Sequence, residues 1–132
     1  MARVLALVPD LLFGSRVEST LRAAGHEVEL IADERRLRER LADAQPTRGD
    51  APPNACTVLV VDLTRAELDG TALVRELARE GKLQRARTLG FFSHVDVHVR
   101  DRAEASGFDL VVPRSRMARE GPALVARLLA GR

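Results

Sequence analysis

Residues 58–62 read VLVVD, an apolar run that ends in an acid, and this stretch decides the fold. A strand that is apolar at every position is typical of the centre of a parallel sheet with helices on both faces. A turn signal follows at Asp69-Gly70, and the apolar spacing over residues 71–80 then predicts a helix. The segment therefore predicts a buried central strand joined to a helix that covers it.

The same strand-then-helix pattern repeats on both sides of this segment. Strict alternation predicts an α/β domain with a parallel sheet, because each right-handed crossover returns a helix to one face of that sheet. The expected strands cover residues 4–8, 27–31, 58–62, 88–92 and 108–112, and the expected helices cover residues 11–24, 34–44, 71–80, 95–106 and 117–129.

Length and composition limit the class of protein. The 132 residues match a single domain, in which the Pro-rich residues 45–55 form a loop insertion between the second helix and the third strand. The net charge is only +2, so nucleic-acid binding is not expected. One cysteine, Cys56, excludes an internal disulfide and fits a reducing compartment. No apolar stretch approaches the roughly 20 residues of a membrane span, and we expect a cytoplasmic protein.

The candidate site lies at one edge of the expected sheet. In open parallel sheets, ligands bind outside the carboxyl ends of the strands. The residues expected there are Asp10 after the first strand, Asp62 at the end of the third, Ser93 after the fourth and Arg114 after the fifth. Two acids, a hydroxyl and a guanidinium are thus expected at one edge.

Several of these features together resemble the receiver domain of bacterial two-component response regulators (the CheY-like family). Gly70 follows Asp62 by eight residues, as a glycine follows the phospho-acceptor aspartate of that family, and Ser93 stands where the family has Thr or Ser. Residues 105–109, ASGFD, and 24–28, AGHEV, are similar to further family motifs. The resemblance implies a flavodoxin-like three-layer sandwich with strand order 2-1-3-4-5. It also implies Asp62 as phospho-acceptor, a bound Mg²⁺ and a histidine kinase or output protein as partner.

The chemistry of this chain departs from the family pattern. The family's two acids after the first strand fall on Val8 and Pro9, so only the displaced Asp10 could help Asp62 to hold Mg²⁺, weakly at best. Arg114 replaces the family's lysine, and Val111 stands at the aromatic switch position. We expect a stand-alone pseudo-receiver with impaired phosphorylation. In it Arg114 either pairs with Asp62, which we favour, or forms a phosphate pocket with Ser93.

A set of arginines is expected on the fourth and fifth helices. In the resembled family this face forms dimers and contacts output partners, so it could support a homodimer or dock an acidic partner or DNA. An ordinary charged surface is the competing interpretation. The members of this interaction face, besides Arg114, are Arg100, Arg102, Arg116 and Arg119.

A second class of function is a flavodoxin-like domain that binds a small ligand or acts as an enzyme, since the fold does not fix the function. No glycine-rich phosphate loop follows the first strand, and no nucleophile-base pair is evident, so an enzyme is not expected. His94 and His98 have zinc-ligand spacing but no evident third ligand, which indicates surface histidines.

Overall fold

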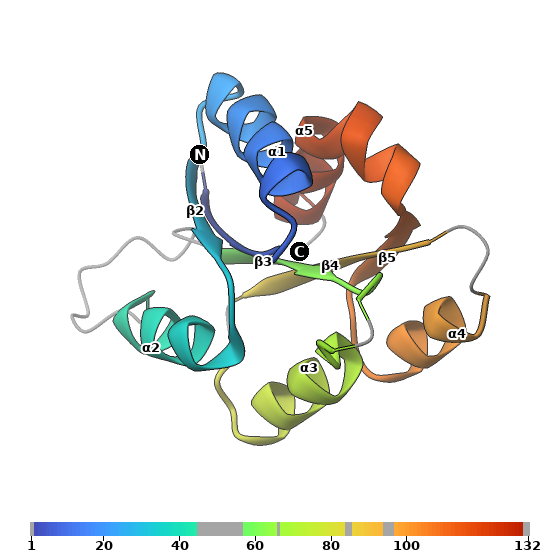
Figure 1. Cartoon of the computed structure of the whole chain (residues 1–132). Coiled ribbons are helices and arrows are strands. Elements are labelled where there is room, and N and C mark those ends of the chain that lie inside the picture. Colours follow the sequence, from blue (N-terminus) through green and yellow to red (C-terminus); the bar gives the residue numbers. More distant parts are fainter. Residues whose placement is uncertain (1, 45–56, 66, 84–85, 94–96, 131–132) are drawn as a thin grey trace.

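The computed structural model describes residues 2–44, 57–65, 67–83, 86–93 and 97–130. Five parallel strands form one sheet in the order β2-β1-β3-β4-β5, with β3 at its centre (Figure 1). This confirms the flavodoxin-like strand order that the resemblance implied. The strands are β1 (Arg3–Leu7), β2 (Glu27–Ile31), β3 (Thr57–Asp62), β4 (Arg87–Phe92) and β5 (Leu110–Pro113).

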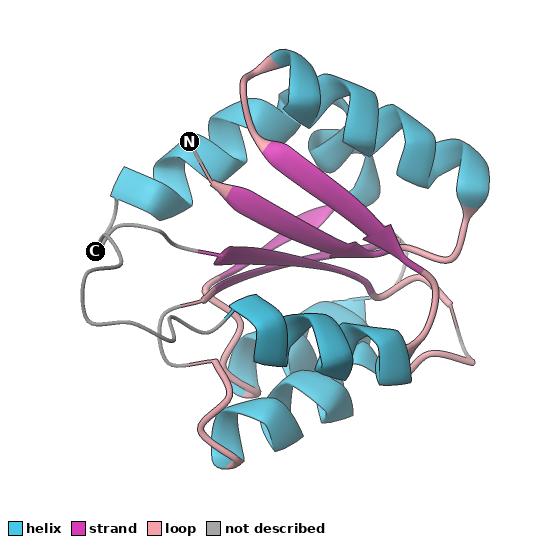
Figure 2. Ribbon diagram, turned by 90° about the vertical axis from the view of Figure 1, so that its left-hand side faces the viewer, coloured by secondary structure: helices cyan, strands magenta, loops and turns pink. Residues whose placement is uncertain are grey.

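Five helices cover the two faces of this sheet. Helices α1 (Leu11–Ala23) and α5 (Arg114–Ala130) lie on one face. Helices α2 (Glu34–Ala44), α3 (Gly70–Arg79) and α4 (Val97–Ala105) lie on the other. Figure 2 shows the resulting three layers, with the twisted sheet between two layers of helices. Among the described residues, no helix has the length and apolar character needed to span a membrane.

Each face of the sheet carries its own apolar core. Val58 and Val60 of β3 point toward α1 and α5, whereas Leu59 and Val61 pack beneath α2 and α3. Adjacent side chains of a strand point to opposite faces, so a strand buried on both sides must be apolar at every position. All four of these side chains are fully buried, which explains why this stretch has no polar residue before Asp62.

The starts of α5 and β5 differ from the sequence prediction by two residues or more. Helix α5 begins at Arg114 instead of Met117, directly after Pro113 ends β5. It is kinked at Glu120, because Pro122 has no N–H to donate to the preceding turn. Strand β5 begins at Leu110 instead of Phe108. At Asp109 the carboxylate accepts a hydrogen bond from the Thr88 N–H, and the Asp109 N–H donates to the Thr88 hydroxyl, so these bonds take the place of the strand ladder. The expected loop insertion at 45–55, Cys56 and His94 lie outside the described residues.

Candidate functional site

Asp62 is buried at the end of β3, with 1% of its surface exposed. Its carboxylate Oδ1 accepts two short hydrogen bonds from Thr64, at 2.7 Å from the backbone N–H and 2.6 Å from the hydroxyl. A carboxylate that bonds the backbone two residues ahead closes a tight turn. Asp62 therefore shapes the start of the loop that leads from β3 to α3.

Asp10 uses both of its carboxylate oxygens in contacts within the fold. It is the N-cap of α1, where Oδ1 accepts from the N–H groups of Leu12 at 3.0 Å and Phe13 at 3.1 Å. Oδ2 lies 3.2 Å from Nη2 of Arg114. The hydrogen bond from the Phe13 backbone, together with the charge of Arg114, lowers the pKa of Asp10 below its ordinary value. Asp10 is thus an ionised helix cap joined to the start of α5.

Arg114 pairs with Asp10 and not with Asp62, so the ion pair that we favoured from the sequence is wrong. Among the residues that the structure describes, Asp10 is its only carboxylate partner within 4.0 Å. The guanidinium also stacks 4.3 Å above the ring centroid of Phe13, and that ring packs 5.0 Å from Phe91 in β4. The reason is the early start of α5, which brings Arg114 beside the first turn of α1.

The residues at this edge do not fit the magnesium site that the fold family implies. Magnesium binds through one or two carboxylates and needs near-ideal octahedral geometry. Both oxygens of Asp10 already have partners, and Pro9 beside it offers no side-chain ligand. Within the described part of the chain, no group of three or more metal-ligating side chains comes together, and His98 belongs to no such group.

Ser93 and Arg114 face a common groove between α1 and α5. The groove has a volume of about 590 Å³, and none of the described residues that line it is acidic. Its polar members are hydroxyls and guanidiniums, which are hydrogen-bond donors suited to an anion. The lining residues are Phe13, Arg16, Thr64, Ser93, Arg114, Ser115 and Ala118.

The arginines expected to form one interaction face do not act as a set. Arg100 pairs with Asp101 at 3.3 Å, and both Arg116 and Arg119 reach Glu120. These ion pairs within single helices offset much of the positive charge. Arg102 does not share a face with Arg100, because residues two apart in a helix point in different directions. Arg102 faces α3.

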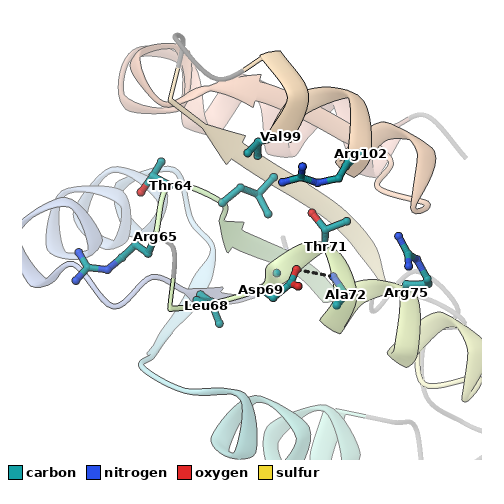
Figure 3. Close-up of a pocket in the computed structure, with 11 residues that line it drawn as sticks. Thr64, Arg65, Leu68, Asp69, Thr71, Ala72, Arg75, Val99 and Arg102 are labelled. Carbon is teal, nitrogen blue, oxygen red and sulfur yellow. Dashed lines mark hydrogen bonds between the residues drawn. The ribbon is translucent and has the colours of Figure 1, made fainter.

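A second cavity lies between α3 and α4, at a place where we predicted no site from the sequence. It encloses about 560 Å³ (Figure 3). Arg75 of α3 and Arg102 of α4 border it, with Thr71 on the first turn of α3. The available signal in the sequence was the helical spacing of Thr71 and Arg75, four residues apart.

Comparisons with known proteins identify the fold. No protein-family model matches the chain, and no curated protein is significantly similar to it. Among solved structures, the chemotaxis response regulator CheY4 of Vibrio cholerae is 24% identical, with a TM-score of 0.72 over 97% of this chain and 98% of that one.

Two further solved structures support the same assignment. The signal receiver domain of a histidine kinase from Syntrophus aciditrophicus is 19% identical, with a TM-score of 0.79 over 99% of this chain and 92% of that one. The receiver domain of the sensor histidine kinase PA1611 from Pseudomonas aeruginosa, which holds a magnesium ion, is 18% identical, with a TM-score of 0.72 over 97% of both chains. The chain therefore has the fold of the CheY-like receiver domains of response regulators.

Proposed function

We propose that this chain is a receiver-like signalling module that acts through a protein partner, without magnesium-dependent phosphorylation of Asp62. One observation carries the proposal: both carboxylate oxygens of Asp10 are occupied, by the first turn of α1 and by Arg114. A magnesium ion would have to share Oδ2 with the Arg114 guanidinium, whose positive charge opposes a dication at this oxygen.

Guanidinium groups supply positive charge at this edge. Arg114 lies against Asp10. The pKa of Arg65 is raised, mainly by its hydrogen bond to Glu67 and to a smaller extent by attraction to Asp62 and Asp10. Two nearby carboxylates repel each other unless cations lie close to them. In our proposal, arginines offset this repulsion in place of a metal ion.

The start of α1 offers a surface for a protein partner. Leu11 and Leu12 are 77% and 87% exposed, directly after Asp10 at the same edge of the sheet. Two adjacent leucines in water are unfavourable for an isolated domain, and a partner that covers them would remove apolar surface from water. Because Asp10 caps this turn, the partner surface is continuous with the candidate site.

The experiment is treatment of the purified protein with acetyl phosphate, with and without Mg²⁺, read by intact-protein mass spectrometry. We expect no Mg²⁺-dependent phosphoryl adduct in this chain, and we expect one in the PA1611 receiver domain as a positive control. Asp62→Asn separates modification of Asp62 from modification elsewhere. An Mg²⁺-dependent adduct that disappears in Asp62→Asn would overturn the proposal.

The groove between α1 and α5 favours a second candidate, a ligand-binding domain in which Ser93 and Arg114 contact an anion. The supporting observation is that Arg16, which also borders the groove, has no carboxylate within 4.0 Å among the described residues. A titration with sulfate, followed by NMR, tests it. Saturable shifts at Ser93 and Arg114 that are lost in Arg16→Ala support this alternative, and shifts that do not saturate contradict it.

A further inference from the structure

We propose that the cavity between α3 and α4 binds a small organic phosphate. Its phosphate group contacts the guanidiniums of Arg75 and Arg102 and the hydroxyl of Thr71. The apolar body of the ligand lies against the side chains that complete the walls. The cavity adjoins the edge of the sheet through Thr64 and Arg65, but this proposal does not depend on the function proposed above. The apolar members of the wall are Leu63, Leu68 and Val99.

Two helix faces bring the polar groups together. Thr71 and Arg75 are four residues apart on α3, and Val99 and Arg102 are three residues apart on α4, so each pair shares one side of its helix. Figure 3 shows the Thr71 hydroxyl and the Arg102 side chain directed into the space between the helices. The polar groups of two separate elements therefore converge on one cavity.

Thr71 places an accessible hydroxyl in the wall of the cavity. Its side chain is more than nine-tenths buried, with 8% exposed. Its hydroxyl forms no hydrogen bond with any residue that the structure describes, and it is not sealed from solvent. The hydroxyl of Thr88, in contrast, is buried and bonds Asp109. The Thr71 hydroxyl is therefore free to bond water at the cavity, and a ligand oxygen can take the place of that water.

The charges of the lining favour an anion. Within the described residues, neither Arg75 nor Arg102 has a carboxylate within 4.0 Å, whereas neighbouring Arg65 and Arg100 are paired. Asp69 is the one acid among the described residues of the lining; it is the N-cap of α3 and accepts from the Ala72 N–H at 3.0 Å. Two unpaired guanidiniums match a phosphate dianion, whose oxygens accept forked hydrogen bonds from arginine.

The size and the remaining walls favour an organic ester over inorganic phosphate. A volume of about 560 Å³ lies within the range of small-molecule sites, and polar and apolar side chains share the walls of this cavity. Leu63, which is buried beneath the cavity, and Val99 of α4 supply such walls. A bare phosphate ion would leave them in contact with water.

The experiment is a titration of the full chain with phenyl phosphate, followed by calorimetry and by NMR amide shifts. We expect saturable binding at one site, with shifts at Thr71 and Val99, and weaker binding of inorganic phosphate and of neutral benzyl alcohol. Arg75→Ala and Arg102→Ala should each weaken binding by about ten- to a hundredfold, because each removes charge-assisted hydrogen bonds. Thr71→Val keeps the shape of the side chain and should weaken binding by about three- to tenfold.

Arg79→Ala is the matched control. Arg79 is on the same helix, carries the same charge and does not line the cavity. Thermal melts of every variant establish that it is folded. Equal weakening by Arg79→Ala would show that net charge alone attracts the ligand. Loss of binding in Arg16→Ala, with Arg75→Ala unaffected, would place the ligand in the groove between α1 and α5. Either result, or the absence of saturation, overturns the proposal.

Discussion

Substitution of Gly70 by alanine tests how tightly α3 is placed against the central strand. A Cβ at this position would lie 2.5 Å from Cγ1 of Val61 and 2.9 Å from Cδ2 of Leu63. Carbon atoms normally approach to about 3.5–4.0 Å, and Val61 is fully buried and β-branched, so it cannot turn aside easily. The first turn of α3 would have to move by about 1 Å, and overpacking of this kind costs about 1–3 kcal/mol.

Alanine makes the unfolded chain less flexible than glycine does, and this stabilises the folded state by about 0.4–1 kcal/mol. With mid-range values of both terms, the net loss for Gly70→Ala is about 1.3 kcal/mol. With an unfolding entropy of about 2.1 cal/mol/K per residue, this lowers the melting temperature by about 5 °C.

Gly14→Ala in α1 is the comparison, because its Cβ would meet Val8 O at 3.4 Å, an ordinary contact. This variant should melt at the wild-type temperature or up to about 3 °C higher, since alanine is favoured over glycine within a helix by about 0.5–1 kcal/mol. Calorimetric melts measure both variants. If Gly70→Ala has the melting temperature of the wild type, or if the two variants lose equal stability, the packing argument fails.

Three further predictions concern the edge of the sheet. Because the helix-capping hydrogen bond holds the pKa of Asp10 low, its stabilising contribution is present above about pH 4 and lost as the pH falls further. The difference in melting temperature between wild type and Asp10→Asn should therefore shrink between pH 5 and pH 3, and a constant difference would contradict this. The double variant Leu11→Ser with Leu12→Ser should change the free energy of unfolding in urea by less than about 0.5 kcal/mol, since both side chains lie in water. A larger loss of stability would show that the two leucines help to hold the fold together. Thr64→Val removes a 2.6 Å hydrogen bond to the buried Asp62 and should cost about 1–3 kcal/mol in urea unfolding, whereas Thr64→Ser should not.

The fold could be predicted from the sequence because the strongest signals are local. The four apolar residues of β3 are buried on both faces, which is the condition that their pattern indicated. The start of α5 could not be placed in the same way. Residues 114–116 are polar and exposed or half-buried, so the apolar spacing of the helix becomes visible only at Met117. The strand order came from the resemblance, since alternation alone does not fix the order of the strands.

The site was harder to predict because it depends on contacts between distant elements. The sequence placed Asp10, Asp62, Ser93 and Arg114 at one edge, but the partner of Arg114 is decided by where α5 starts relative to α1. The cavity between α3 and α4 required the relative placement of two helices, which helical spacing within either one cannot supply.

The residues that carry the family resemblance have roles in packing that do not require phosphoryl transfer. Asp62 closes the turn after β3 through Thr64, and Gly70 allows α3 to begin against Val61 and Leu63. Both features follow from the geometry of a strand that passes into a covering helix, whatever chemistry occurs at the edge. Two positions that supply chemistry in the family differ in this chain: Pro9 replaces an acid, and Arg114 replaces the lysine. The function that we propose agrees with this pattern: the chain keeps the packing residues of the fold, and its signal comes from binding to a partner.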